Sequence, residues 1–273
     1  GDKILDVPLS KVGGKGLFVK EIEEALLQGE IDLAVHSMKD MPAKIPAGLQ
    51  IGPIPKREDP RDALISHTGA PWSALPAGCR IGTSSLRRQA QLKRSRPDLI
   101  FLSLRGNLDT RLRKVRAGEI DAIILAAAGL HRMGWQNRIT DYLPIEVSLP
   151  AIGQGALALE CRSEDKNVHA AIAFLNDPDT GYEMEAERAM LTRLEGGCQV
   201  PIAGFAKKTG EQIELEGLVS NLDGTEVVRE KRRRPIKEAE ALGIEVAELL
   251  LAKGADRILK ELSEKNLFEE GAP

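Results

Sequence analysis

In the first part of the chain, one segment has the spacing of hydrophobic residues typical of a helix, and the next has the alternation typical of a strand. Residues 17–27 place apolar side chains on one side of a helix and glutamates on the other, and Gly29 can end that helix. Residues 31–35 alternate as a strand does and run on toward Lys39 and Asp40. A loop, a helix and a strand in this order predict a piece of an α/β sheet.

A second unit with the same mixture of periods lies between residues 61 and 148. Two segments rich in proline, glycine or charge, residues 54–62 and 148–155, join it to the first unit. A chain that leaves one lobe and later returns is typical of a hinged pair of lobes with a ligand site between them. The predicted strands of this unit are 79–82, 99–104 and 122–125, and its predicted helices are 86–95, 108–117 and 126–133.

The last third of the chain predicts a smaller α+β unit. Residues 221–224 form a hairpin signal, and the helical periodicity of residues 236–265 is interrupted near Gly243 and Gly254. The basic residues 231–234 are expected to be a solvated strand end. The predicted strands on either side of the hairpin are 213–220 and 225–231, and a predicted helix at 183–194 precedes them.

Positive charge gathers in one stretch of a chain whose formal net charge is -3. Residues 79–118 hold eleven basic residues but only two carboxylates, Asp98 and Asp109. A solvated helix face would explain a single basic helix, but this concentration favours a polyanion, or a small molecule with several acidic groups, as the ligand. The basic residues are Arg80, Arg87, Arg88, Lys93, Arg94, Arg96, Arg105, Arg111, Arg113, Lys114 and Arg116.

The hydroxyl residues Thr83, Ser84 and Ser85 stand where the first strand of this unit turns into a helix. Backbone N–H groups and the helix dipole at such a turn favour anions. Arg87 and Arg88 follow in the first helical turn and add guanidinium groups that fit carboxylate or phosphate.

A similar polar segment follows the second predicted strand. Arg105 and Gly106 come after residues 99–104 as the hydroxyl residues come after residues 79–82. Because the carboxyl ends of parallel strands meet at one edge of a sheet, both basic groups are expected at the same edge. That convergence suits a ligand with several carboxylates.

Composition narrows the class of protein. The chain has 273 residues, of which 42% are hydrophobic and 29% charged, which is typical of a globular protein with two or three domains. Aromatic residues make up only 3%, and with a pI of about 6.0 this argues against a nucleic-acid-binding protein. No apolar run is long enough to span a membrane, and no secretory signal opens the chain.

The cysteines and histidines suggest no disulfide framework and no metal site. Cys79, Cys161 and Cys198 are odd in number, lie far apart and form no CxxC pair, and the four histidines lack ligand spacing. A reducing, cytoplasmic compartment fits this pattern best.

Three features stay open when only residue types and spacing are considered. Lys11 and Lys15 lie in a glycine-rich loop that is not a Walker A loop, and that is either an ordinary surface loop or a lid over a bound anion. Asp40 is either a catalytic carboxylate or the start of a turn before Pro42. Cys198 lies in a glycine-rich loop with no activating histidine placed beside it, which favours an ordinary buried cysteine over a nucleophile.

Four strings of residues together resemble the porphobilinogen deaminases, also called hydroxymethylbilane synthases. The resemblance covers essentially the whole chain, with the motifs in the family's order. It implies two lobes like those of periplasmic binding proteins and a third, small α+β domain at the C-terminal end. The implied domains are residues 1–55 with 151–176, residues 61–148, and residues 178–273. The strings are Ser37-Met38-Lys39-Asp40, Gly82-Thr83-Ser84-Ser85-Leu86-Arg87-Arg88, Leu104-Arg105-Gly106-Asn107 and Glu195-Gly196-Gly197-Cys198-Gln199-Val200-Pro201.

The resemblance also implies a reaction and a cofactor. The family is a transferase of heme biosynthesis that condenses four porphobilinogen molecules head to tail, with loss of ammonia, to give hydroxymethylbilane. A dipyrromethane cofactor is attached to the enzyme through a cysteine, which falls on Cys198 here. Family precedent implies a cytoplasmic monomer. The family has a first strand and helix before the point where this sequence begins, and they are absent from it.

Roles for individual residues follow by match of motif. The resemblance makes Asp40 the catalytic carboxylate. The alternative, a two-lobed module that binds small anions without catalysis, gives no role to Asp40 or Cys198. The implied cofactor-binding residues are Cys198, Lys39, Thr83, Ser84, Ser85, Arg87, Arg88, Arg105 and Gly106, and the implied substrate-binding residues are Arg111, Arg132, Lys11, Lys15 and Phe18.

Overall fold

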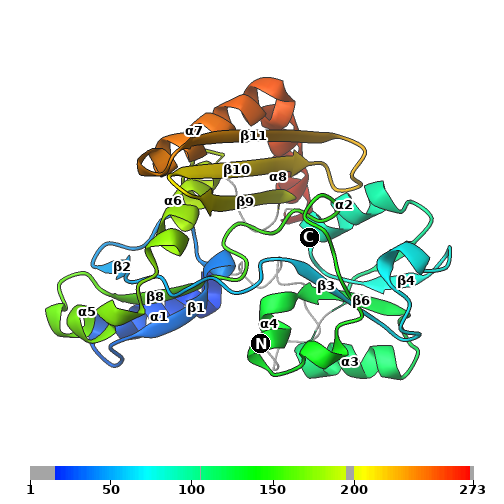
Figure 1. Ribbon diagram of the computed structural model, residues 1–273, viewed down its shortest axis with the longest axis horizontal. Coiled ribbons are helices and arrows are strands. Elements are labelled where there is room, and N and C mark those ends of the chain that lie inside the picture. Colours follow the sequence, from blue (N-terminus) through cyan, green and yellow to red (C-terminus); the bar gives the residue numbers. More distant parts are fainter. Residues whose placement is uncertain (1–15, 105, 195–199, 271–273) are drawn as a thin grey trace.

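The computed structural model describes residues 16–104, 106–194 and 200–270, and these form three sheets with their own helices. In Figure 1 the first and second lobes lie side by side, and the third sheet lies above them. The chain passes from the first lobe to the second and back before it enters the third unit. This arrangement confirms the predicted fold class, an α/β protein with two lobes and a small α+β C-terminal domain.

The first lobe is built around β8 (Leu157–Arg162), which lies between β1 (Ala34–Ser37) and β2 (Leu49–Ile51) and is antiparallel to both. Helix α1 (Gly16–Gln28) contributes Leu26 to one core cluster of this lobe. Helix α5 (Lys166–Ile172) ends in Ile172, which packs on β8. The strand predicted at 31–35 begins three residues later, and a short 3-10 turn, η1 (Met38–Asp40), follows it directly.

The second lobe has a five-stranded sheet of order β5-β4-β6-β3-β7. Strand β4 is parallel to both β5 and β6, whereas β3 is antiparallel to β6. The segments that follow β4 and β5 therefore lie at the same edge of the sheet, as predicted. The strands are β3 (Asp62–Ser66), β4 (Arg80–Gly82), β5 (Ile100–Leu102), β6 (Ala122–Ala126) and β7 (Asp141–Tyr142), and the helices are α2 (Leu86–Ser95), α3 (Leu108–Arg116) and α4 (Ala127–Arg132).

The third unit is an antiparallel sheet, β11-β10-β9, covered by helices α6 and α7. Hydrophobic side chains of β9, β10, α6 and α7 share one core cluster. The strands are β9 (Ile202–Thr209), β10 (Gln212–Ser220) and β11 (Val227–Pro235), and the helices are α6 (Pro178–Arg193), α7 (Ala239–Leu250) and α8 (Asp256–Glu270), with the π-helical turn η6 (Leu251–Ala255) between α7 and α8.

Two glycines of the third unit behave differently from each other. Gly254 has φ 104° and marks a kink between α7 and α8, as the sequence predicts. Gly243 lies inside the continuous helix α7, so the predicted interruption there is wrong. A Cβ atom at this position would lie 2.3 Å from the carbonyl oxygen of Ala186, so glycine lets α7 pack closely against α6.

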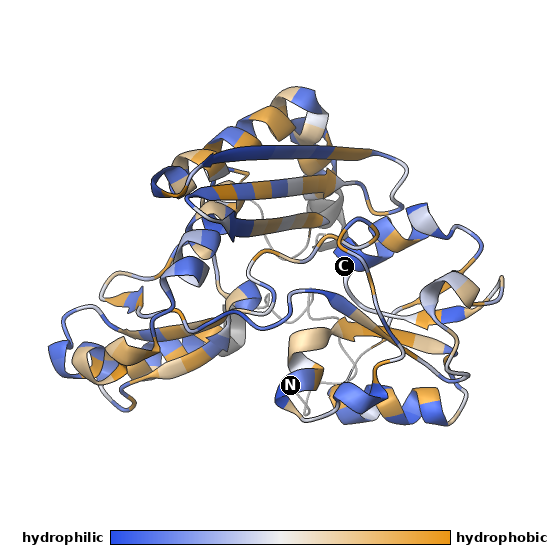
Figure 2. Cartoon of the chain, viewed as in Figure 1, coloured by the Kyte–Doolittle hydropathy of each residue, from blue (hydrophilic) through white to orange (hydrophobic). Residues whose placement is uncertain are grey.

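The basic run at residues 231–234 lies on β11, whose hydrophilic part is visible in Figure 2. Residues 231–233 are exposed and Arg234 is partly buried, near the end of the strand, so the expectation of a solvated strand end is confirmed. Lys231 also contacts Glu214 at 2.7 Å, and Arg234 contacts Glu245 at 2.6 Å. Among the helices of the described ranges, none has the length and apolar character that a membrane crossing requires.

Candidate active site at the junction of the two lobes

The hydroxyl residues between β4 and α2 build the turn that orients the first turn of α2. Ser85 is the N-cap of α2 and its Oγ accepts a hydrogen bond from the backbone N–H of Arg88 at 3.4 Å. Thr83 Oγ1 accepts one from the N–H of Ser85 at 3.2 Å, and Ser84 Oγ donates to the carbonyl of Leu104. All three side chains bond to the chain itself, as capping residues do.

Arg87 and Arg88 point from α2 to one buried carboxylate, that of Asp62. Nη1 of Arg87 lies 2.9 Å from one oxygen of Asp62, and Nη2 of Arg88 lies 2.7 Å from the other. Arg87 also donates to the carbonyl of Leu149 at 2.6 Å, and Arg88 to the carbonyl of Ile124 at 3.1 Å. The two arginines predicted to bind a ligand are thus also committed to protein acceptors.

Asp62 is the first residue of β3 and is completely buried. Ser148 Oγ donates to it at 2.7 Å and Gln154 Nε2 at 3.0 Å, so both crossings between the lobes meet at this carboxylate. Burial alone would raise its pKa, but the charges of Arg87 and Arg88 outweigh that effect and hold the pKa of Asp62 well below its usual range. The sequence did not single out Asp62, because it is one of several charged residues in the segment 54–62.

Lys39 and Asp40 belong to the turn η1, which follows β1 in the first lobe. Asp40 is exposed and Lys39 is partly buried. Burial, together with the positive charge of Arg88, lowers the pKa of Lys39 to about 8, while Asp40 and Asp62 act in the opposite direction. The ammonium group of the first lobe is therefore within electrostatic range of the arginines of the second lobe.

Arg111 extends this group of cations from α3. Its Nε donates to the carbonyl of Gly106 at 2.8 Å, and burial together with the charge of Arg88 lowers its pKa. Gly106 has φ 103°, and a Cβ atom there would lie 2.9 Å from Thr110 Cγ2, so the turn before α3 requires glycine. Arg132 is exposed at the end of α4 and donates to the carbonyl of Gly155 at 2.7 Å.

Several predicted site residues lie outside the described residues: Lys11, Lys15, Arg105 and Cys198. Phe18 lies on α1, but the structure describes only its backbone. Within the described residues the free cysteines are Cys79, partly exposed, and Cys161, buried.

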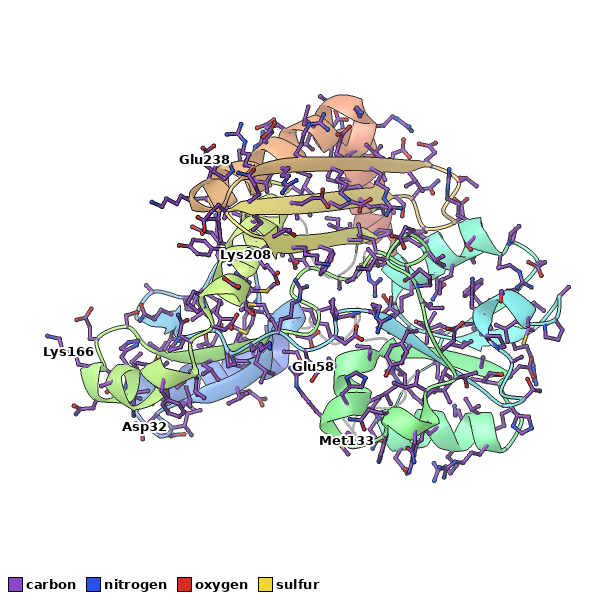
Figure 3. All side chains as sticks on the ribbon, in the orientation of Figure 1. Asp32, Glu58, Met133, Lys166, Lys208 and Glu238 are labelled. Carbon is purple, nitrogen blue, oxygen red and sulfur yellow. The ribbon has the colours of Figure 1, made fainter. Side chains whose placement is uncertain are left out.

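A short segment from the second crossing, residues 153–155, touches all three units. Gly153 has φ 73°, and a Cβ atom there would lie 2.6 Å from Met38 Cγ and 3.1 Å from the backbone nitrogen of Lys39. Gly155 has φ 92°, and its Cβ atom would lie 2.4 Å from the carbonyl oxygen of Glu58. Figure 3 shows Glu58 between the two lobes. Only glycine allows the backbone to approach the first lobe and the first crossing this closely.

A second buried carboxylate, that of Glu187 on α6, holds the third unit to the same segment. It accepts a hydrogen bond from the N–H of Gly153 at 2.6 Å and pairs with Arg57 at 2.7 Å. Arg57 belongs to the first crossing, and its Nε donates to the carbonyl of Gln154 at 2.9 Å. Helix α6, which leads toward Cys198, is therefore fixed to the junction of the lobes.

Chemically, the junction combines fixed cations with one exposed carboxylate. Together with burial, the charge of Arg88 lowers the pKa of both Lys39 and Arg111, so these three residues form one cationic site. Such a site suits carboxylates, and a dipyrromethane with acidic side chains fits this donor set. Arg87 Nε, which is buried and has no hydrogen-bond partner in the described part of the chain, is a further unused donor.

Comparison with protein families shows which family the chain belongs to. The model of the porphobilinogen deaminase dipyromethane cofactor binding domain matches residues 1–170, and the model of the porphobilinogen deaminase C-terminal domain matches residues 182–252. The chain belongs to the porphobilinogen deaminase family.

Relatives named porphobilinogen deaminase match over nearly the whole chain. One from Geobacter metallireducens is 56% identical over 270 residues, which are 99% of this chain and 85% of the relative. One from Syntrophobacter fumaroxidans is 58% identical over 262 residues, which are 96% of this chain and 85% of the relative. Family membership confirms the predicted transferase class and the predicted dipyrromethane cofactor, and it does not favour a binding module without catalysis.

One matching solved structure is far more distant in sequence. An arginine-specific periplasmic binding protein of Salmonella typhimurium has 13% identity and a TM-score of 0.36, and the match covers 56% of this chain and 70% of that protein.

Proposed function

We propose that this porphobilinogen deaminase joins four porphobilinogen molecules and one water into hydroxymethylbilane, with release of four ammonia molecules, at the cationic site between its lobes. At each addition the bond from the aminomethyl carbon to nitrogen breaks, a bond to a pyrrole α-carbon forms, and that α-carbon loses its proton. The dipyrromethane supplies the pyrrole on which the chain begins. The side chains of the protein would bind the carboxylates of the substrate, stabilise charge that develops in the reaction and transfer protons.

The cationic site carries this proposal. Each pyrrole of the chain bears an acetate and a propionate, so every addition brings two more negative charges. Lys39, Arg88 and Arg111 would hold these carboxylates, because their own mutual repulsion is relieved when anions bind. A bound carboxylate would also favour the charged form of Lys39, whose pKa is about 8 in the protein alone.

Asp40 is proposed as the catalytic carboxylate. It lies beside Lys39 at the exposed end of η1, so it can reach a ligand held by the cations. An ionised carboxylate at that place would stabilise the positive charge that develops as ammonia leaves, and it would accept the proton that the ring carbon loses.

Further residues are proposed to shape the site. Arg87, Thr83, Ser84, Ser85, Arg105 and Gly106 would bind or orient the cofactor, with the hydroxyl residues acting mainly through the turn that they build. Arg132 and the segment with Lys11, Lys15 and Phe18 would bind incoming substrate. The thioether to the cofactor would be formed by Cys198.

We propose three domains that follow the three sheets: residues 1–55 with 151–176, residues 61–148, and residues 178–273. Each of these ranges contains one of the sheets of the described chain. We further propose a cytoplasmic monomer that acts on a small molecule, without a nucleic-acid or membrane partner, as the family precedent and the composition suggest.

Intact-mass analysis of the purified chain tests the cofactor assignment. The wild-type chain is expected to carry the mass of a dipyrromethane, and Cys198→Ser is expected to lose it together with activity. Cys79→Ser is the matched control, since Cys79 is a free and partly exposed thiol of the second lobe, and it should keep the added mass. An active wild-type chain with no added mass, or an added mass that persists in Cys198→Ser, would overturn the assignment.

A further inference from the structure

Asp62 occupies a position that none of the proposed ligand-binding roles explains. It stands opposite Ala126 in the antiparallel pair of β3 and β6, and so lies at the edge of the sheet where β6 ends. That is the edge from which Thr83 and Gly106 continue. A completely buried carboxylate at the active edge of a sheet requires a compensating reason, because burying a charge is costly.

The bonds of Asp62 supply that reason. Its Oδ1 accepts from Nε of Arg88 at 2.9 Å and from Nη2 of Arg87 at 3.2 Å, while its Oδ2 accepts from Nη1 of Arg87 at 2.9 Å. The carboxylate therefore bridges two guanidinium groups from adjacent residues of one helix. Without it the two cations would repel each other in a buried setting.

We propose that Asp62 is the positioning residue of the cationic site: it holds the guanidinium groups of Arg87 and Arg88 together, and its negative charge lets Lys39 stand beside them as a third cation. This inference rests on the proposed function, in which these cations receive the carboxylates of the cofactor and the growing chain. Asp62 acts through the three cations and does not touch the ligand.

The charges that face Lys39 come from both lobes. Arg87 and Arg88 on α2 oppose its protonation, whereas Asp40 on its own turn and Asp62 on β3 favour it. With Asp62 present, the two arginines leave an excess of one positive charge. With Asp62 neutralised, the excess becomes two, and Lys39 would lose its proton at a lower pH.

Asp62→Asn tests this directly, because the substitution removes the charge and keeps the shape of the side chain. Pulse labelling of amines with acetic anhydride, followed by mass spectrometry of the Lys39 peptide, gives the pH at which Lys39 becomes reactive. In the wild-type chain the midpoint is expected at about pH 8. In Asp62→Asn it should fall by at least about half a pH unit, which corresponds to the loss of one nearby charge.

Asp121→Asn is the matched control in the same sheet. Asp121 pairs with Arg80 at 2.8 Å just before β6, at the opposite edge from Asp62, and is no cause of the Lys39 shift. It should leave the labelling midpoint of Lys39 unchanged. A folded Asp62→Asn chain whose Lys39 labels as in the wild type would overturn the proposal.

A second variant keeps the test decisive if Asp62→Asn does not fold. Arg88→Gln removes the cation that most strongly opposes protonation of Lys39, so the labelling midpoint should rise. A midpoint that stays in place or falls would contradict the proposal. Because labelling needs neither turnover nor cofactor, this result is separate from the mass of Cys198, on which the proposed function is tested.

Discussion

Asp62 and Glu187 are two completely buried carboxylates at the same junction, and they differ in the charge that surrounds them. Asp62 pairs with two arginines, Arg87 and Arg88, so its neighbourhood carries an excess of positive charge. Within the described ranges Glu187 pairs only with Arg57, which also lies 3.5 Å from Glu183, so that neighbourhood carries an excess of negative charge.

The comparison teaches that a buried ion pair alone does not identify a binding site. Both carboxylates bond to the crossing segment, Asp62 through Gln154 and Glu187 through Gly153. Only the neighbourhood of Asp62 continues into further cations at Lys39 and Arg111. The sign of the uncompensated charge, not burial, separates the place that can receive an anionic ligand from the place that holds the domains together.

The largest effect on stability is expected at the second carboxylate. Glu187→Ala leaves Arg57 buried without its main partner, and the free energy of unfolding should fall by about 3–5 kcal/mol. Urea unfolding measures this loss.

The double substitution Glu187→Ala with Arg57→Met is the control for that measurement. Because it removes both charges, it should recover a large part of the lost stability. If the single variant unfolds like the wild type, then Glu187 does not hold the third unit to the lobes.

Asp40→Asn should show the opposite behaviour, with little change in stability and a large change in turnover. Asp40 is exposed, so neutralising it costs the fold little, whereas loss of a catalytic carboxylate reduces kcat by about 10²–10⁴-fold. Steady-state kinetics beside a thermal melt separates the two effects. Turnover within a factor of two of the wild type would remove Asp40 from the mechanism.

Gly153→Ala should produce a smaller effect that involves both neighbourhoods. The added Cβ would contact Met38 and the backbone of Lys39, and the positive φ adds strain, so a loss of about 1–3 kcal/mol is expected. Gly69→Ala is the matched control, because Gly69 has φ 74° and no atom within 4 Å of the Cβ position. Equal losses in the two variants would show that the backbone angle alone matters and that contact with Lys39 does not.

Periodicity predicted much of the fold. Helix α2 has the predicted bounds, Leu86–Ser95, and the ends of α3 and β6 differ from prediction by a single residue. In these elements the apolar positions that determine the period are also the ones that pack in the core. The parallel pairing of β4 and β5 could be expected because a helix connects them.

Elements that depend on distant contacts were missed. Strand β3 is not predicted, and its first residue, Asp62, falls in the predicted crossing, because Asp62 continues a charged segment and becomes buried only through α2 and the second crossing. Strand β9 was not predicted. The predicted interruption near Gly243 is wrong because α7 needs a residue without a side chain where it meets α6.

The candidate site, too, could be predicted only in part from the sequence. Motif strings singled out Lys39, Asp40 and Arg88, and the family resemblance added Arg111, but spacing could not show that Arg88 pairs with Asp62. Neither Asp62 nor Glu187 carries a local signal, since their partners lie in segments far away along the chain. These two buried ion pairs can be recognised only in the folded structure, where the distant segments come together.

The attachment of α6 at Glu187 limits how far the end of this helix can move relative to the lobes. From Glu187 to Leu194, the last described residue before the loop of Cys198, the helix extends only about 10 Å. A tilt of roughly 10° about Glu187 would therefore displace that end by only about 2 Å. The described end of α6 is thus nearly stationary relative to the junction of the lobes, because its attachment lies only about two helical turns away.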